Sequence, residues 1–234
     1  MNENPEIPTW IMTLIALGFF GGLAAFAFWL KERRRTGFEA LARRFDLEYH
    51  EDGAHAVPLP PEFIAEITRG FVVDARAGEA LAGEIDGVPI AVCELRRLRA
   101  SSGGSERAHY SASMAWAQLP DLLPNFSITP RTRWRRLLGP RDAAEIGFDG
   151  PVAFTRRYAV SGPDPDAIRA LFTAPVREFL ANHPGRRIHS YGSEIIGYRP
   201  PRMLRWSAFR PATAEQMLHE WTAFLRRLRG SGTP

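Results

Sequence analysis

The sequence predicts an α+β protein, with one N-terminal transmembrane helix followed by an antiparallel-sheet domain whose helices lie toward the C-terminus. The first observation behind this prediction is an uncharged apolar run from Trp10 to Leu30. The second is a series of short alternating segments joined by turn residues such as Asp86-Gly87, and the third is a set of amphipathic helical segments after Asp164. Hairpin-joined strands with helices segregated to one end are typical of the α+β class.

The apolar run is long enough to span a membrane. Its 21 residues, at about 1.5 Å each, cover roughly 30 Å, the thickness of the hydrocarbon layer. Trp10 and Trp29 lie near its ends, where indole rings favour the membrane interface. Ala25-Phe26-Ala27 resembles a signal-peptide cleavage site, but the residues before the run carry two acids and no Lys or Arg. Because signal peptides begin with a basic segment, the pattern favours a retained anchor.

The charges after the run predict its orientation. Residues 31–35 read Lys-Glu-Arg-Arg-Arg and carry a net charge of +3, so the positive-inside rule places this end in the cytoplasm. We therefore expect a single-pass protein of the bacterial inner membrane. Its expected parts are a short extracytoplasmic tail (1–9), a transmembrane helix (10–30), a basic flank and juxtamembrane helix (31–46), a cytoplasmic α+β domain (47–229) and a disordered tail (230–234).

The excess of basic residues in the whole chain says less about function than the position of the charges does. Of the 30 Lys and Arg residues only Lys31 is a lysine, and this arginine-rich composition, with many Ala, Gly and Pro, is typical of a GC-rich bacterial genome. The net charge of +4 and the pI near 9.7 therefore argue little for nucleic acid. No aromatic stacking platform of the kind found in RNA-binding modules is apparent, so nucleic acid is not expected as a partner.

Small residues form a stripe along the apolar run. Gly18, Gly21, Gly22 and Ala25 follow i, i+3, i+4, i+7 spacing and include a GxxxG pair. Such a stripe lets two membrane helices approach closely, which would give a homodimer. Gly and Ala are also simply common in membrane helices, so we keep helix dimerisation as a hypothesis.

The first elements after the membrane are short. Thr36 and Glu39 fit a capping box for a short juxtamembrane helix, which could lie on the membrane or on its own domain. Residues 46–60 are expected to be a connecting loop or a short strand. Pro60-Pro61 can then open a second short helix, which ends at Gly70 and has an apolar face of Phe63, Ile64 and Ile67.

The strands follow. Residues 82–85 and 88–98 are separated by Asp86-Gly87, a pair suited to a type I′ turn, and are expected to form a hairpin. The further expected strands are residues 107–119, 125–129, 152–161, 187–191, 194–198 and 203–208. This strand count also allows a small closed sheet of pleckstrin-homology type with a C-terminal helix.

The last helices have recognisable boundaries. Asp164-Pro165 combines an N-cap with proline at the first helical position, and Pro175 is expected to kink or divide the helix that follows. Thr213 and Gln216 fit a capping box for the final helix. The apolar face of that helix consists of Met217, Trp221, Phe224 and Leu228.

Taken together, several features resemble a group of proteins. They are the single span, the basic flank, the Asp-Gly hairpin, the proline-punctuated residues 119–124, and the segment 154–164, Phe-Thr-Arg-Arg-Tyr-Ala-Val-Ser-Gly-Pro-Asp. This succession resembles uncharacterised bacterial single-pass membrane-anchored proteins of unknown function. The resemblance implies a membrane anchor and brings no activity or site residues with it.

No motif predicts catalysis, a cofactor or a metal. His50 and His55 lie five residues apart with Gly53 between them, whereas zinc-binding HExxH needs four on one helix face. Cys93, the only cysteine, lies mid-strand and is expected to be buried. No G-x-S-x-G, Walker or G-x-G-x-x-G motif occurs. The alternative is a membrane-bound enzyme, a hydrolase, with a site assembled from scattered His and acidic residues.

One basic segment is a candidate membrane contact. Arginines alternate there with apolar residues, a mixture suited to lipid phosphates and the interface. The set is Arg131, Arg133, Trp134, Arg135, Arg136 and Arg141. A half-buried turn whose Trp134 packs on the core fits the same pattern. The function expected from the sequence is thus a membrane-tethered cytoplasmic binding or scaffolding domain, with the lipid bilayer and an unknown protein as partners.

Overall fold

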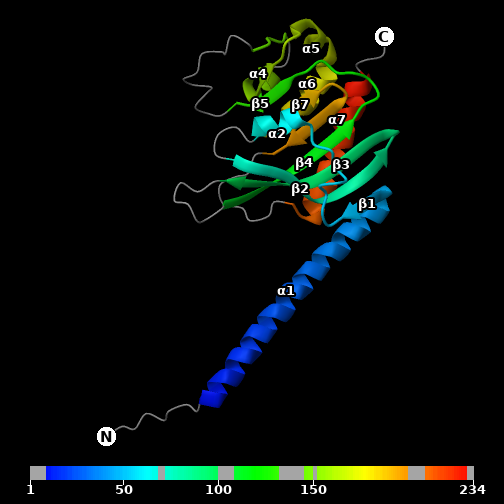
Figure 1. The fold of residues 1–234 in the computed structure, drawn as a ribbon. Coiled ribbons are helices and arrows are strands. Elements are labelled where there is room, and N and C mark those ends of the chain that lie inside the picture. The colour runs from blue at the N-terminus through cyan, green and yellow to red at the C-terminus, as the bar shows by residue number, and fades with distance from the viewer. Residues whose placement is uncertain are drawn as a thin grey trace.

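The computed structural model describes residues 9–67, 72–99, 108–131, 145–149, 152–199 and 209–230. Within them, an eight-stranded antiparallel sheet has the order β1-β2-β3-β4-β8-β7-β5-β6, and one long helix leaves the sheet as a rod (Figure 1). The strands are β1 (Leu47–His50), β2 (Val72–Ile85), β3 (Val88–Arg99), β4 (Ala108–Gln118), β5 (Ser127–Pro130), β6 (Tyr158–Ser161), β7 (Arg187–Tyr191) and β8 (Glu194–Tyr198). The helices are α1 (Thr9–Phe45), α2 (Pro61–Ile67), α4 (Val152–Arg157), α5 (Pro165–Leu171), α6 (Ala174–Asn182) and α7 (Pro211–Gly230).

The predicted α+β class is confirmed, with an apolar helix at the N-terminus and a helix at the C-terminus. The strand order leaves β1 and β6 as the two edges of the described sheet. A closed sheet of pleckstrin-homology type is therefore not confirmed.

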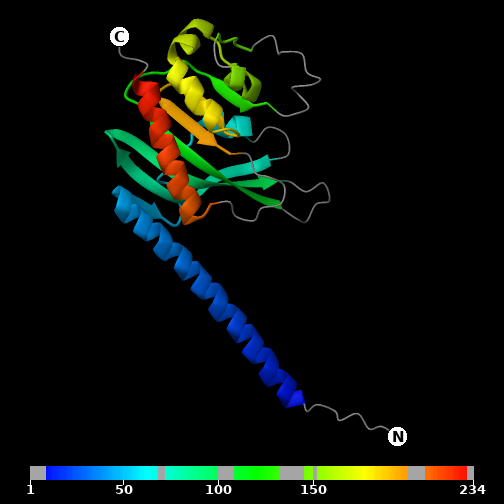
Figure 2. The ribbon, with the colours of Figure 1, turned by 180° about the vertical axis from the view of Figure 1, so that it is seen from behind.

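Both faces of the sheet are buried. α7 crosses one face, as the view from behind shows (Figure 2), and its Trp221 and Phe224 share a core there with Phe38 of α1. The other face packs against α2 and the residues before it, with Phe63 near Tyr198 and Val57 in the same core. Strand residues alternate between these two cores, because successive side chains in a strand point to opposite faces.

Helix α1 corrects the prediction of a separate juxtamembrane helix. It is one continuous helix of 37 residues. Thr36 does not cap it, because its hydroxyl donates back to the carbonyls of Glu32 and Arg33 at 2.9 and 3.1 Å. Glu39 instead forms an i, i+4 ion pair with Arg35 at 2.8 Å. The capping-box residues lie in a segment that is already helical, so the pattern was misleading.

The Asp-Gly hairpin is confirmed. Asp86 and Gly87 both have positive φ, 55° and 73°, as a type I′ turn requires. Strand β2 begins at Val72, ten residues before the predicted start at 82. The missed part is rich in Ala and Gly, which have little intrinsic preference for strands, and the burial of both faces compensates for this.

Two element predictions near the C-terminal half are wrong. The expected strand 152–161 starts as helix α4 and becomes β6 only at Tyr158. The buried Phe154 and Tyr158 lie four residues apart, a spacing that fits a helix as well as a strand. The capping box at Thr213 is also wrong, because α7 has already begun at Pro211.

Other boundaries are confirmed. The Asp164 side chain accepts a hydrogen bond from the Ala167 amide at 3.0 Å and caps α5. Pro175 lies at the start of α6, which is separate from α5. The strand expected at 203–208 lies outside the described residues.

Candidate functional site

The N-terminal part of α1 is an exposed apolar rod. Every side chain that the structure describes between residues 10 and 30 is exposed, including Phe20 at 67% and Phe28 at 70%. Among the described residues, α1 is the helix long and apolar enough to cross a membrane, with a mean hydropathy of 2.0 in its most apolar window. An apolar surface this large marks a membrane or protein contact.

The C-terminal part of α1 belongs to the folded domain. Phe38 is fully buried and stacks with Tyr49 and Phe209 at ring distances of 5.5 and 5.1 Å. One turn earlier, Arg34 forms an ion pair with Glu79 of β2 and donates to the Phe209 carbonyl at 3.0 Å. The apolar rod is therefore joined to the sheet without an intervening loop.

The predicted stripe of small residues lies on the exposed rod. A Cβ added at Gly18, Gly21 or Gly22 would meet no atom within 4 Å, and Ala25 is exposed beside them. The surface is thus open to a second helix, and helix dimerisation stays a prediction.

Only Arg131 of the predicted basic membrane contact lies within the described residues. Its guanidinium pairs with Glu145, and its Nε donates to the Tyr158 carbonyl at 3.1 Å. The other members, Arg133, Trp134, Arg135, Arg136 and Arg141, lie outside the described residues. The membrane contact of this segment stays a prediction.

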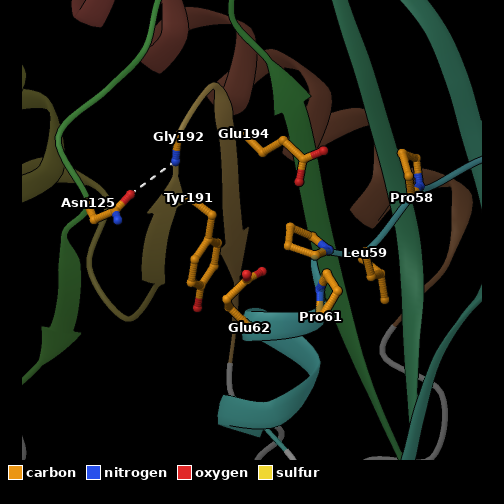
Figure 3. A pocket seen from close by; sticks show the side chains of 9 residues that line it. Pro58, Leu59, Pro61, Glu62, Asn125, Tyr191, Gly192 and Glu194 are labelled. Atoms are coloured by element: carbon orange, nitrogen blue, oxygen red, sulfur yellow. Dashed lines mark hydrogen bonds between the residues drawn. The ribbon is translucent and has the colours of Figure 1, made fainter.

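A pocket of about 450 Å³ opens beside α2 (Figure 3). The residues that line it come from segments far apart in the chain: Pro58, Leu59, Pro60, Pro61, Glu62, Asn125, Tyr191, Gly192 and Glu194. The β7–β8 turn supplies one wall, and Gly192 turns the chain there with a φ of +62°. Its amide donates to Asn125 Oδ1 at 3.0 Å, which fixes the turn against the loop before β5.

We call this the acidic pocket, because its charged lining consists of Glu62 and Glu194. Burial raises the pKa of the Glu194 carboxyl, and the charge of Glu62 raises it further. The pKa of the Tyr191 hydroxyl is also raised, by burial and by the hydrogen bond that it donates to Glu66 at 2.7 Å. A pocket with carboxylates, a neutral tyrosine and proline walls suits a cationic or amide-bearing group.

A partly buried polar cluster shares Tyr191 with the acidic pocket. His189 is 2% exposed, and its Nδ1 lies 3.2 Å from Glu66 Oε2, the oxygen that also accepts from Tyr191. Glu66 thereby ties α2 to β7. His189 lies two residues before Tyr191, so the two side chains share one face of β7, and this spacing is the signal in the sequence that could have linked them.

Possible metal ligands and the single cysteine are the remaining chemical groups to place in the described part of the chain. No group of three or more His, Cys, Asp or Glu side chains is placed there to hold a metal ion. Cys93 is buried, as predicted, and burial raises the pKa of its thiol. A buried thiol of this kind is a poor nucleophile.

A larger recess, of about 900 Å³, lies between residues 119–124, α5 and the end of α7. We call it the apolar groove. Leu122 at its edge is 83% exposed. Arg226 and Arg229 line it on the α7 side, and both bind Asp86 of the β2–β3 turn, at 2.7 and 3.1 Å.

These features define a class of molecule, an α+β domain that carries one exposed apolar helix at its N-terminal end. No protein-family model and no curated protein matches the chain. Among solved structures, the mycobacterial trehalose monomycolate transport factor A, TtfA, is 17% identical, covers 84% of this chain and 89% of its own, and superimposes with a TM-score of 0.44. A likeness this distant carries no conclusion about activity, ligand or partner.

Proposed function

We propose that this chain is a membrane-tethered domain that binds a protein partner at the cytoplasmic face of a bacterial inner membrane, without catalysis. The observation that carries the proposal is the division of α1. Residues 10–30 are apolar and exposed, while Phe38 and Leu41 of the same helix are buried in the domain core. Water is an unfavourable solvent for such a rod, and each Leu, Ile, Phe or Val at the centre of a membrane helix contributes about −0.3 to −0.6 kcal/mol to insertion.

The orientation rests on the basic flank. Lys31, Arg33, Arg34 and Arg35 follow the apolar residues directly, against a single acid, Glu32. Basic residues next to a span are retained on the cytoplasmic side. This supports a cytoplasmic domain from residue 31 onward.

A binding role is favoured over catalysis by the two recesses. The apolar groove has the size and lining expected for side chains of a protein segment. The acidic pocket brings two carboxylates together, but its tyrosine is held neutral and its lining holds no nucleophile paired with a base. A hydrolase site in this pocket would have to use Glu62 and Glu194 as its carboxylates.

Reporters fused after Pro234 test the orientation. We expect a fusion to green fluorescent protein to fluoresce and a fusion to alkaline phosphatase to be inactive, because phosphatase matures only outside the cytoplasm. An active phosphatase with a dark fluorescent fusion would reverse the proposed topology.

Site-specific photo-crosslinking tests the binding role. A photoreactive residue at Leu122 should give a discrete covalent protein adduct in cells, and Ala170→Arg, which fills the apolar groove, should abolish it. Val152 is the matched control, because it is an exposed apolar side chain, at 58%, away from the groove. Identical adduct patterns from residues 122 and 152, or adducts that survive Ala170→Arg, would contradict binding in the groove.

A further inference from the structure

We infer that the folded domain stands directly on the bilayer surface in one fixed orientation, and that Lys31, Arg33 and Arg210 contact anionic lipid headgroups there. The inference rests on the proposed membrane anchoring of α1 and specifies how the anchored domain meets the membrane. It follows from the spacing, stiffness and charge of the junction between the rod and the sheet.

The distance along α1 between the apolar run and the domain core is short. Seven residues, 31–37, separate the end of the apolar run at Leu30 from the first buried core residue of α1, Phe38. In a helix they rise about 10 Å. The headgroup region adds about 5–8 Å to each side of the hydrocarbon layer. The domain core therefore begins within a few ångströms of the headgroups.

The junction is also stiff. It is helical throughout, and its one glycine, Gly37, is pressed against the start of α7, where an added Cβ would lie 2.9 Å from Cγ of Pro211. The Arg34 ion pair with Glu79 and the stacking of Phe38 hold the next turn to the sheet. A change in the angle between residues 34–38 of α1 and the domain would break all these contacts together.

Three cations at this level have no carboxylate partner among the described residues: Lys31, Arg33 and Arg210, all exposed. Arg34 and Arg35, by contrast, are paired with Glu79 and Glu39. The Arg33 guanidinium lies 5.3 Å from the ring centre of Trp29, an indole placed where interfaces hold tryptophan. Unpaired cations at headgroup depth complement anionic lipids.

Helix α7 then sets which surfaces face away from the membrane. It begins at the junction and packs beside the end of α1, through the Arg44–Glu215 ion pair and the contact of Phe45 with His219 at 5.1 Å. Its 20 residues extend about 30 Å. Figures 1 and 2 show its C-terminal end on the side of the domain away from the N-terminal end of α1. The apolar groove at that end is thus presented to the aqueous compartment.

Fluorescence quenching in vesicles tests the orientation. The full-length chain carries Cys93→Ala and one new cysteine, Ala212→Cys next to the junction or Leu122→Cys at the apolar groove. It is reconstituted in phosphatidylcholine with phosphatidylglycerol, and a headgroup-attached quencher is included. We expect strong quenching of a fluorophore at residue 212 and none at residue 122. A flexible Gly-Ser insertion after Arg33 should abolish the difference; equal quenching without the insertion overturns the inference.

Lipid exchange tests the headgroup contact. Combined Lys31→Gln, Arg33→Gln and Arg210→Gln should lower phosphatidylglycerol enrichment around the protein to near the fraction of this lipid in the bulk vesicle. The same charge removed at Arg156, Arg169 and Arg227, exposed residues away from the junction, should leave the enrichment unchanged. Equal enrichment in both triple variants would overturn the headgroup contact. Failure of the chain to float with the vesicles would instead refute the proposed membrane anchoring, so the two failures are distinguishable.

Discussion

Arg34 on α1 forms an ion pair with Glu79 on β2, and the same guanidinium donates to the carbonyl of Phe209, immediately before α7. Glu79 also accepts from the Tyr49 hydroxyl at 3.3 Å. The two charged side chains are only 32% and 17% exposed. One arginine at the base of the rod therefore joins three segments that are distant in the chain.

Removing this arginine should loosen the junction. We expect Arg34→Met to lower the free energy of unfolding of the full chain in detergent by about 1–2 kcal/mol, because it leaves Glu79 partly buried without its cation. Arg33→Met is the matched control, since Arg33 has no carboxylate partner in the described chain. Denaturant titrations followed by tryptophan fluorescence measure both. If the two substitutions lowered the free energy of unfolding equally, the contacts of Arg34 would not stabilise the junction more than those of Arg33.

The packing of α7 on the sheet depends on a glycine. Gly197 of β8 faces Trp221, and an added Cβ would lie 2.5 Å from Cζ3 of the indole. Gly197→Ala should therefore lower the free energy of unfolding by about 1–3 kcal/mol, the usual cost of overpacking. Gly147→Ala is the control, because a Cβ there meets nothing within 4 Å. If the denaturation midpoints of the Gly197→Ala and Gly147→Ala variants were the same, β8 and α7 would not be in the close contact described.

The acidic pocket should make stability depend on pH. The pKa of Glu194 is raised in the folded protein, so the folded state holds this proton more tightly than the unfolded state. The stability that this carboxyl contributes is fully present below its pKa in the unfolded state. It is lost as pH rises through its pKa in the folded state. Glu194→Gln should raise Tm more at pH 7 than at pH 4. A Tm difference that is constant across this range, or larger at pH 4, would contradict the raised pKa.

The small-residue stripe makes a homodimer testable. Gly18→Ile with Gly22→Ile should reduce self-association of the full chain in bacterial membranes, measured by energy transfer between fluorescent fusions, because bulky side chains prevent close helix approach. Ala16→Ile with Ala27→Ile is the matched control, because it adds similar bulk on the opposite side of the helix. The dimer hypothesis fails if self-association is unchanged by the glycine substitutions.

Local sequence patterns correctly predicted some of the turns, caps and helix boundaries that depend on a few adjacent residues. The Asp86-Gly87 turn, the Asp164 cap and the division at Pro175 each depend on a few adjacent residues. Segment 152–157 was mistaken for a strand because the burial of Phe154 and Tyr158 fits either period.

The acidic pocket could not be predicted from local sequence patterns. Glu62 precedes the main hairpin, and Tyr191 and Glu194 flank a turn near the far end of the chain. The strand order β4-β8-β7-β5 places β7 and β8 near β5, and the contacts of Glu66 with Tyr191 and His189 bring α2 to the same place. The spacing of residues along the sequence does not reveal the order of the strands, because the strand order is set by packing against both faces of the sheet.

The central claim, that α1 anchors the domain by crossing a bilayer, is tested most directly by alkaline carbonate extraction of membranes from cells that express the full chain. We predict that the full chain stays in the membrane pellet, while a chain lacking residues 10–30 moves to the supernatant. Release of the full chain by carbonate, at the same level as the shortened chain, would contradict the account.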